Sequence, residues 1–244
     1  MGAGQGRKAV CVLDIDDLTT EALCRYMLER QRDTISVQKP EFALRKLNVI
    51  ITAALDLSNR KGFQAMSLRD LSRASGVSMG GLYAYFDSKT TLLNMILSEV
   101  TAAVERVLST PPAAVQGDAV AHLNWLIATH IQMTEAMQPW FTFSFMEAKN
   151  FPPAERKKAI ESEELTESYF KAVIDAGIKA GDFRAATSPL LPALIKPLLQ
   201  DWYVKRAKYR RRRVGIDTYI ATVQDFVQSA CLADQTRKDH RATA

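Results

Sequence analysis

Two serines and two glycines stand at a spacing that suits contact with a phosphate backbone. Ser67 and Ser78 each precede a short run with helical apolar spacing, and Gly80 and Gly81 fall in the first turn of the second run. A hydroxyl at a helix start caps the first turn, and the free N–H groups there attract phosphate. Glycines in that turn leave an almost bare surface, so the backbone can approach base edges in a major groove. The spacing therefore places groups that bind phosphate well at the starts of two short helices.

The flanking segments predict the helices that would position these groups. Apolar residues recur at three- and four-residue steps over 42–61, and Gly62 follows two basic residues, where a left-handed helix end suits glycine. A short helix is predicted over 68–75 and a second over 79–86, with Gly76 at the turn between them. Ser88 is expected to cap a long connecting helix over 89–109. These elements form a helix-turn-helix followed by a long helix.

The remainder of the chain also has helical spacing. Helices are predicted over 118–137, 140–150, 154–180, 188–209 and 216–232, with a kink at Pro197. No period of two persists, so the expected fold class is all-α: an N-terminal three-helix helix-turn-helix domain and a C-terminal helical domain.

The first 40 residues differ from the rest. A short apolar run is followed by loose helical spacing over 18–32, and that run is too short for a signal peptide. Two interpretations stay open. Translation begins at Met27, or the segment is a helical arm that flanks the first domain.

Composition narrows the class of protein. The chain has 244 residues, 47% of them hydrophobic, and a net charge of +5, and no apolar run approaches the length of a membrane span. Cys11, Cys24 and Cys231 form no CxxC pair, which favours a reducing compartment, here the cytoplasm, and disfavours a zinc site. No nucleophile elbow, phosphate loop, metal cluster or paired carboxylates stand out. We therefore expect neither an enzyme nor a bound cofactor or metal.

The run GVSMGGLYAYFDSK over 76–89, with its flanks over 45–92, resembles the DNA-binding domain of the TetR/AcrR family of bacterial transcriptional regulators. About 50 consecutive residues match in identity and spacing. The resemblance implies DNA contacts from helix starts and from the second short helix: Arg45, Ser67, Arg69, Ser78, Met79, Gly80, Gly81, Tyr83 and Lys89. Two positions depart from the family pattern, because Gly81 is commonly Thr and Ala84 commonly His. The absence of the Thr and His side chains at these positions removes two polar groups that contact DNA in the family.

The resemblance also implies the organisation of the chain. Residues 1–40 are an extension of uncertain role, 41–95 the DNA-binding domain, 96–235 a helical effector-binding and dimerisation domain, and 236–244 a tail. The helices over 188–209 and 216–232 are expected to pair with their copies, so that a homodimer binds a palindromic double-stranded operator. The implied function is a repressor released by a small apolar, aromatic or acyl-type effector. The alternative is a TetR-like DNA-binding protein that a partner protein regulates, or an activator without a small-molecule ligand.

Large apolar side chains over 120–150 predict the effector pocket. The candidates are Trp125, Met133, Met137, Phe141 and Phe145. Glutamates at 161, 163, 164 and 167 indicate a solvated helix face, and His122 and His130 are interpreted as structural.

Seven basic residues and no acidic one lie in 205–213, KRAKYRRRR. A solvated loop is the favoured interpretation of this run, with a phosphate contact or a site for an anionic effector as the alternatives.

Overall fold

The computed structural model describes residues 15–30 and 40–233, and within these ranges it is helical without a β-strand. The all-α expectation is confirmed. The helices are α1 (Thr20–Arg30), α2 (Pro40–Lys61), α3 (Leu68–Ser75), α4 (Met79–Tyr83), α5 (Lys89–Leu108), α6 (Ala119–Ala136), α7 (Gln138–Glu147), α8 (Pro153–Ala180), α9 (Leu191–Val204), α10 (Arg206–Arg211) and α11 (Ile216–Cys231). Short 3-10 turns lie at Ile15–Leu18, Ala113–Val115 and Ala148–Asn150.

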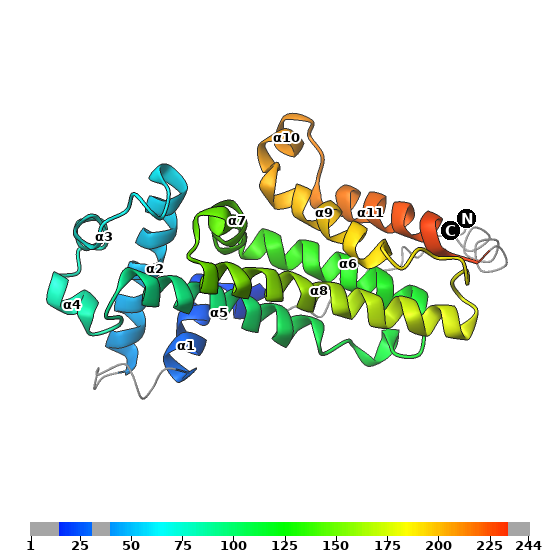
Figure 1. Cartoon of the computed structure of the whole chain (residues 1–244), viewed down its shortest axis with the longest axis horizontal. Coiled ribbons are helices and arrows are strands. Elements are labelled where there is room, and N and C mark those ends of the chain that lie inside the picture. Colours follow the sequence, from blue (N-terminus) through cyan, green and yellow to red (C-terminus); the bar gives the residue numbers. More distant parts are fainter. Residues whose placement is uncertain (1–14, 31–39, 234–244) are drawn as a thin grey trace, which may run out of the picture.

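Helices α2, α3 and α4 form one end of the molecule (Figure 1). The predicted caps are present: Ser67 and Asp70 form a reciprocal capping box on α3, and Ser88 accepts a hydrogen bond from Thr91 N at the start of α5. Gly76 has φ +67° between α3 and α4, a backbone conformation that favours glycine. These local contacts fix the angle between the two short helices.

Helix α4 is shorter than predicted. It ends at Tyr83 instead of continuing to residue 86. The cause is tertiary, because the Tyr85 hydroxyl donates to Ala43 O in α2, and the rings of Tyr85 and Phe86 are both buried. The chain turns inward after Tyr83 to place both rings in the core.

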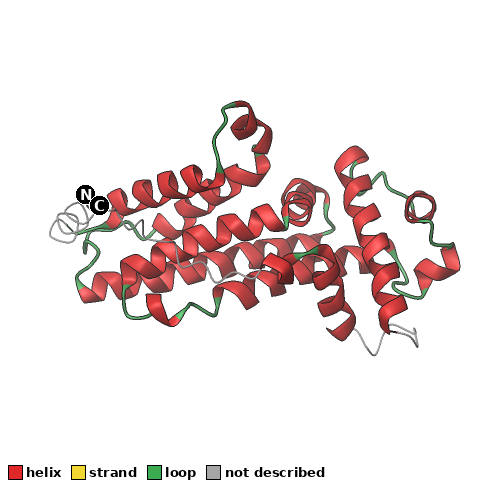
Figure 2. Ribbon diagram, turned by 180° about the vertical axis from the view of Figure 1, so that it is seen from behind, coloured by secondary structure: helices red, strands yellow, loops and turns green. Residues whose placement is uncertain are grey.

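The C-terminal part is a bundle in which α5, α6 and α8 run along the long axis (Figures 1 and 2). Helices α9 and α11 form a hairpin on one side of it, and α7 lies across its end nearer the helix-turn-helix. Gly181, with φ +86°, ends α8 and turns the chain so that the Phe183 ring packs on Gly177. A Cβ at Gly177 would overlap that ring, which explains a glycine inside a long helix.

The basic run over 205–213 is not the solvated loop that the sequence indicated. The helix predicted over 188–209 breaks at Lys205, and α10 carries most of the run as a further short helix. Pro197 lies inside α9, as predicted.

Helix α1 is packed into the fold. Leu23, Cys24 and Met27 are buried against α2 and α5, and Arg30 forms an ion pair with the fully buried Glu99 of α5. Residues 20–30 therefore form a helix that flanks the first domain. A start at Met27 would remove the first two of these side chains from the core. Residues 1–14, 31–39 and 234–244, including Cys11 and most of the tail, lie outside the described residues.

Candidate nucleic-acid interface and ligand cavity

Helix α4 presents an exposed, nearly bare surface. Ser78 caps it by accepting a hydrogen bond from Gly81 N at 3.2 Å, while Gly80 has no neighbour within 4 Å of the position a Cβ would take. Tyr83 follows on the same short helix with 53% of its surface exposed. Met79 is partly buried against the core. The exposed groups of α4 are therefore its backbone at Gly80, the capping hydroxyl of Ser78 and the phenol of Tyr83.

Gly81 has a packing reason that the sequence did not show. A Cβ there would lie 2.8 Å from Val77 Cγ1 and 3.2 Å from Ser78 Oγ. Val77 is buried in the corner between α3 and α4, so it has little room to move. The departure from threonine at this position therefore fits the close approach of the two helices here.

The start of α3 is held by a charged network. The Asp70 carboxylate accepts hydrogen bonds from Lys61 Nζ at 2.6 Å and from the Ser67 hydroxyl at 2.7 Å. The Lys61 bond, with the bonds from Ser67, lowers the pKa of Asp70 well below its usual range. Ser67 is therefore engaged in the cap. Arg45 and Arg69 are exposed and free of ion pairs within the described part of the chain.

Lys89 has a role that the sequence did not predict. Its Nζ donates to the carbonyls of Phe63 (3.2 Å), Gln64 (2.9 Å) and Met66 (3.1 Å), in the loop between α2 and α3. An ammonium has three donors, and these bonds use all of them. Burial lowers the pKa of Lys89 as well. The residue ties that loop to α5, and the predicted phosphate contact requires these bonds to open.

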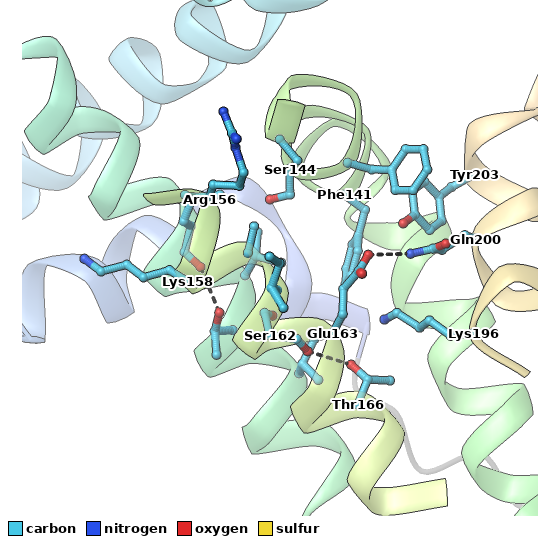
Figure 3. A pocket seen from close by; sticks show the side chains of 18 of the residues that line it. Phe141, Ser144, Arg156, Lys158, Ser162, Glu163, Thr166, Lys196, Gln200 and Tyr203 are labelled. Carbon is cyan, nitrogen blue, oxygen red and sulfur yellow. Dashed lines mark hydrogen bonds between the residues drawn. The ribbon is translucent and has the colours of Figure 1, made fainter. Parts of the chain in front are cut away.

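A cavity of about 400 Å³ lies between α5, α7, α8 and α9 (Figure 3). Its apolar wall includes Leu97, Val100, Val104, Phe141, Ile160 and Tyr203. Of the five predicted pocket residues, Phe141 and Phe145 line this cavity.

The other three, Trp125, Met133 and Met137, do not line the cavity and are buried in the core. These three side chains lie away from this cavity because α6, which carries Trp125 and Met133, packs against α8, α9 and α11 and contributes nothing to the cavity wall.

Polar side chains that the sequence reasoning missed also line the cavity. Lys196 on α9 is almost fully buried, and Ser144 Oγ on α7 has no hydrogen-bond partner among the described residues. Glu163 accepts a hydrogen bond from Gln200 Nε2 at 2.7 Å. It is half-buried in the wall, which corrects its placement on a solvated face, whereas Glu161 and Glu164 are exposed. A lysine within the apolar run of α9 was the available signal for this site.

Comparison with known families accounts for both the helix-turn-helix and the domain that holds the cavity. The family model for bacterial regulatory proteins of the tetR family matches residues 50–96, which hold the helix-turn-helix. The model for the tetracyclin repressor-like C-terminal domain matches residues 116–203, which hold most of the cavity wall. The chain belongs to the TetR family. Members of the TetR family are transcriptional regulators that bind DNA operators and act as dimers, and they are not enzymes.

Individual TetR-family relatives agree. The HTH-type transcriptional repressor KstR2 of Rhodococcus jostii (strain RHA1) is 27% identical over 142 residues, which are 56% of this chain and 67% of the relative. A tetR-family regulatory protein from Rhodococcus RHA1 superposes with a TM-score of 0.66 at 19% identity, covering 76% of this chain and 97% of that one. PfmR from Thermus thermophilus gives a TM-score of 0.56 at 24% identity, with 73% and 94% covered. These two structures share the fold.

His130 lies behind the cavity of this TetR-family chain. It is fully buried, its ring is 6.0 Å from that of Phe141, and neither nitrogen has a hydrogen-bond partner among the described residues. Burial, and secondarily the charge of Lys196, hold its pKa well below the usual value, so the imidazole is neutral. Across residues 15–30 and 40–233, no group of three or more His, Cys, Asp or Glu side chains is arranged to hold a metal ion. Likewise, no described helix is long and apolar enough to cross a membrane.

Three of the seven basic residues in the run over 205–213 form ion pairs with the C-terminal helical region of this TetR-family chain. Lys205 and Lys208 pair with Asp201 at 2.7 Å each, and Arg206 pairs with Glu135 at 2.6 Å. Burial would raise the pKa of the Asp201 carboxyl, but the hydrogen bonds from its partners outweigh burial and hold the pKa at about 2. The four arginines over 210–213 are exposed.

Proposed function

We propose that the protein is a repressor that binds a palindromic operator as a homodimer and leaves it when a small molecule fills the cavity. Residues 41–95 are assigned to DNA binding and residues 96–235 to effector binding and dimerisation. The name of the repressor relative and the two family matches support the direction of regulation.

The observation that carries the proposal is the double role of α5. This helix begins at the Ser88 cap directly after the helix-turn-helix, and Lys89 ties its first turn to the loop before α3. Farther along, the same helix supplies Leu97, Val100 and Val104 to the cavity wall. A ligand that moves this wall therefore acts on the helix that holds the reading head, by which we mean the helix-turn-helix of α2, α3 and α4. Allostery requires that the ligand contact this wall differently in the DNA-bound and the released state.

The dimer surface is assigned to α9 and α11. Leu190, next to the start of α9, and Leu194 are 65% and 60% exposed, and Phe226 on α11 is 62% exposed. Both helices lie on the same outer side of the bundle (Figure 1). Large exposed apolar groups on neighbouring helices are typical of a self-complementary two-fold interface. Two reading heads would then face half-sites about one helical turn or more apart.

The alternative, regulation by a partner protein without a ligand, expects a closed C-terminal core. A cavity of about 400 Å³ falls in the usual size range of small-molecule sites, and unpaired polar atoms lie in its wall. These features favour the ligand-controlled regulator.

Fluorescence anisotropy with the DNA upstream of the gene tests the proposal. The wild type is expected to bind an inverted repeat there, with affinity that falls as salt rises. Arg69→Ala is expected to weaken binding by about threefold to tenfold and to lower the salt slope by about 1, because one phosphate contact is lost. Lys171→Ala, at an exposed cation of α8 that pairs with Asp175, is the control for loss of one charge and should leave affinity unchanged. Absence of a specific complex at moderate salt would overturn the proposal.

A further inference from the structure

The Lys196 ammonium is buried without a partner. The residue is 8% exposed and has neither an ion pair nor a hydrogen bond to any described residue. Figure 3 shows its side chain reaching from α9 toward the cavity, beside Glu163 and Thr166. An ammonium on so buried a residue, with no hydrogen-bond acceptor among the described residues, is unusual in native structures, and it lines a cavity where a ligand could supply the acceptor.

The groups around Lys196 keep it charged without pairing with it. Burial lowers the pKa of Lys196 to about 8, and the carboxylates of Glu163 and Glu167 on α8 oppose that shift. His130 on α6 faces it as a neutral ring. At neutral pH the amine is therefore an ammonium, and the nearby Glu163 carboxylate is already held by Gln200.

The wall carries an excess of positive charge. Lys149, Arg156, Lys158 and Lys196 line the cavity, against the single acidic residue Glu163 within the described part of the chain. Lys149, Arg156 and Lys158 are exposed, so they mark the outer rim, whereas Lys196 is at the buried end. The apolar part of the wall includes Val100, Val104 and Phe141. Such a site suits a molecule with an apolar body and an anionic group.

We infer that the effector is a hydrophobic carboxylic acid whose carboxylate binds the Lys196 ammonium at the buried end of the cavity. This inference rests on the proposed function, because it names the chemical class of the ligand of the same site. The apolar body lies against α5 and α7, where Leu97 and Phe141 form the wall. Ser144 Oγ supplies a second free hydrogen-bonding group for a polar substituent on that body.

Calorimetry with matched probes tests the inference on the full-length protein. The probes are decanoate and 4-phenylbutyrate, each compared with its own primary amide, which keeps the shape and removes the charge. We expect at least one acid to bind about tenfold or more tightly than its amide, because only the carboxylate brings a negative charge to the ammonium. Equal affinities of acid and amide, or no binding of either acid, would overturn the inference.

Variants assign the preference to one side chain. Lys196→Met keeps the unbranched apolar stem and removes the charge, and it is expected to abolish the preference for acid over amide. Lys196→Arg should retain it. Lys179→Met, an exposed lysine at the end of α8, is the control for loss of one charge. A preference that survives in Lys196→Met would refute the role of this lysine.

Anisotropy in the presence of the same probes separates this inference from the proposed function. Release of operator by an acid but not by its amide supports both. An acid that binds through Lys196 yet leaves the operator complex intact supports the ligand class and refutes effector control. Release by the amide as readily as by the acid supports effector control and refutes the ligand class.

Discussion

The two regions of the molecule treat buried polar groups in opposite ways. In the helix-turn-helix, Ser58 Oγ donates to Ala54 O at 2.7 Å and Ser72 Oγ to Val77 O at 2.6 Å, and no described buried side-chain polar atom there lacks a partner. In the C-terminal region, Ser144 Oγ, Thr129 Oγ1 and both nitrogens of His130 have none. The difference indicates that buried polar side chains are more completely hydrogen-bonded in the helix-turn-helix than in the C-terminal region.

The largest test of this difference compares two leucines. Leu82→Ala, in α4, is expected to lower the free energy of unfolding by about 3 kcal/mol, because it opens a new cavity in a close-packed corner. Leu97→Ala enlarges a cavity that already exists, so its cost is expected to be about 2 kcal/mol or less. Urea unfolding of both variants checks this. Equal costs would mean that the two regions are packed alike.

The second test uses the charge of Lys196. Its pKa, lowered by burial to about 8 from 10.5, means that the unfolded chain binds more protons than the folded one between these values. Stability should therefore rise with pH over that window, by about 2 kcal/mol relative to Lys196→Met between pH 7 and pH 10. Thermal unfolding of both proteins across this range measures the gap. Parallel curves would show that the folded environment of Lys196 resembles water.

Hydroxyl deletions should have opposite signs in the two regions. Ser72→Ala removes the bond to Val77 O and is expected to destabilise the fold by about 1 kcal/mol. Thr129→Val replaces an unpaired buried hydroxyl by a methyl of the same shape, so it should be neutral or stabilise by up to about 1 kcal/mol. Chemical denaturation gives both values. A clear loss in Thr129→Val would reveal a partner for that hydroxyl.

The smallest effect is expected for the two glycines of α4. Gly80→Ala meets open space and should stabilise the protein by a few tenths of a kcal/mol, up to about 0.5, through loss of unfolded-state entropy. Gly81→Ala meets Val77 Cγ1 at 2.8 Å and should destabilise it by about 0.5 kcal/mol or more. The melting temperatures of the pair are compared directly. A stabilising Gly81→Ala would remove the packing explanation for this glycine.

Local signals made the reading head predictable. Ser67, Gly76 and Ser78 act on residues within three or four positions of themselves, so their roles follow from spacing alone. The end of α4 was missed because its cause, the bond from Tyr85 to Ala43, spans 42 positions. The role of Lys89 in tying the loop before α3 to α5 was missed for the same reason, since its three carbonyl partners lie 23 to 26 positions away.

The cavity depends on contacts that no short segment encodes. Phe141 and Met133 are both large apolar residues of the same region, yet one faces the cavity and the other the core, as decided by which helices pack beside them. Glu163 belongs to the wall because Gln200, 37 positions away, holds it there. Residue type therefore predicted that an apolar pocket exists, but not its full lining.

Helix α1 has a mechanical consequence. Its first residue, Thr20, accepts a hydrogen bond from Trp140 Nε1 of α7 at 3.3 Å, its middle packs on α2 and α5, and Arg30 at its end is paired with Glu99 of α5. Eleven residues of helix span about 16 Å, so this short rod is fixed at several points across the joint between the two domains. The helix-turn-helix is therefore not joined to the rest of the molecule through α5 alone. A tilt of the helix-turn-helix relative to α5 would have to move α1 as well, or break its contacts with α5 and α7.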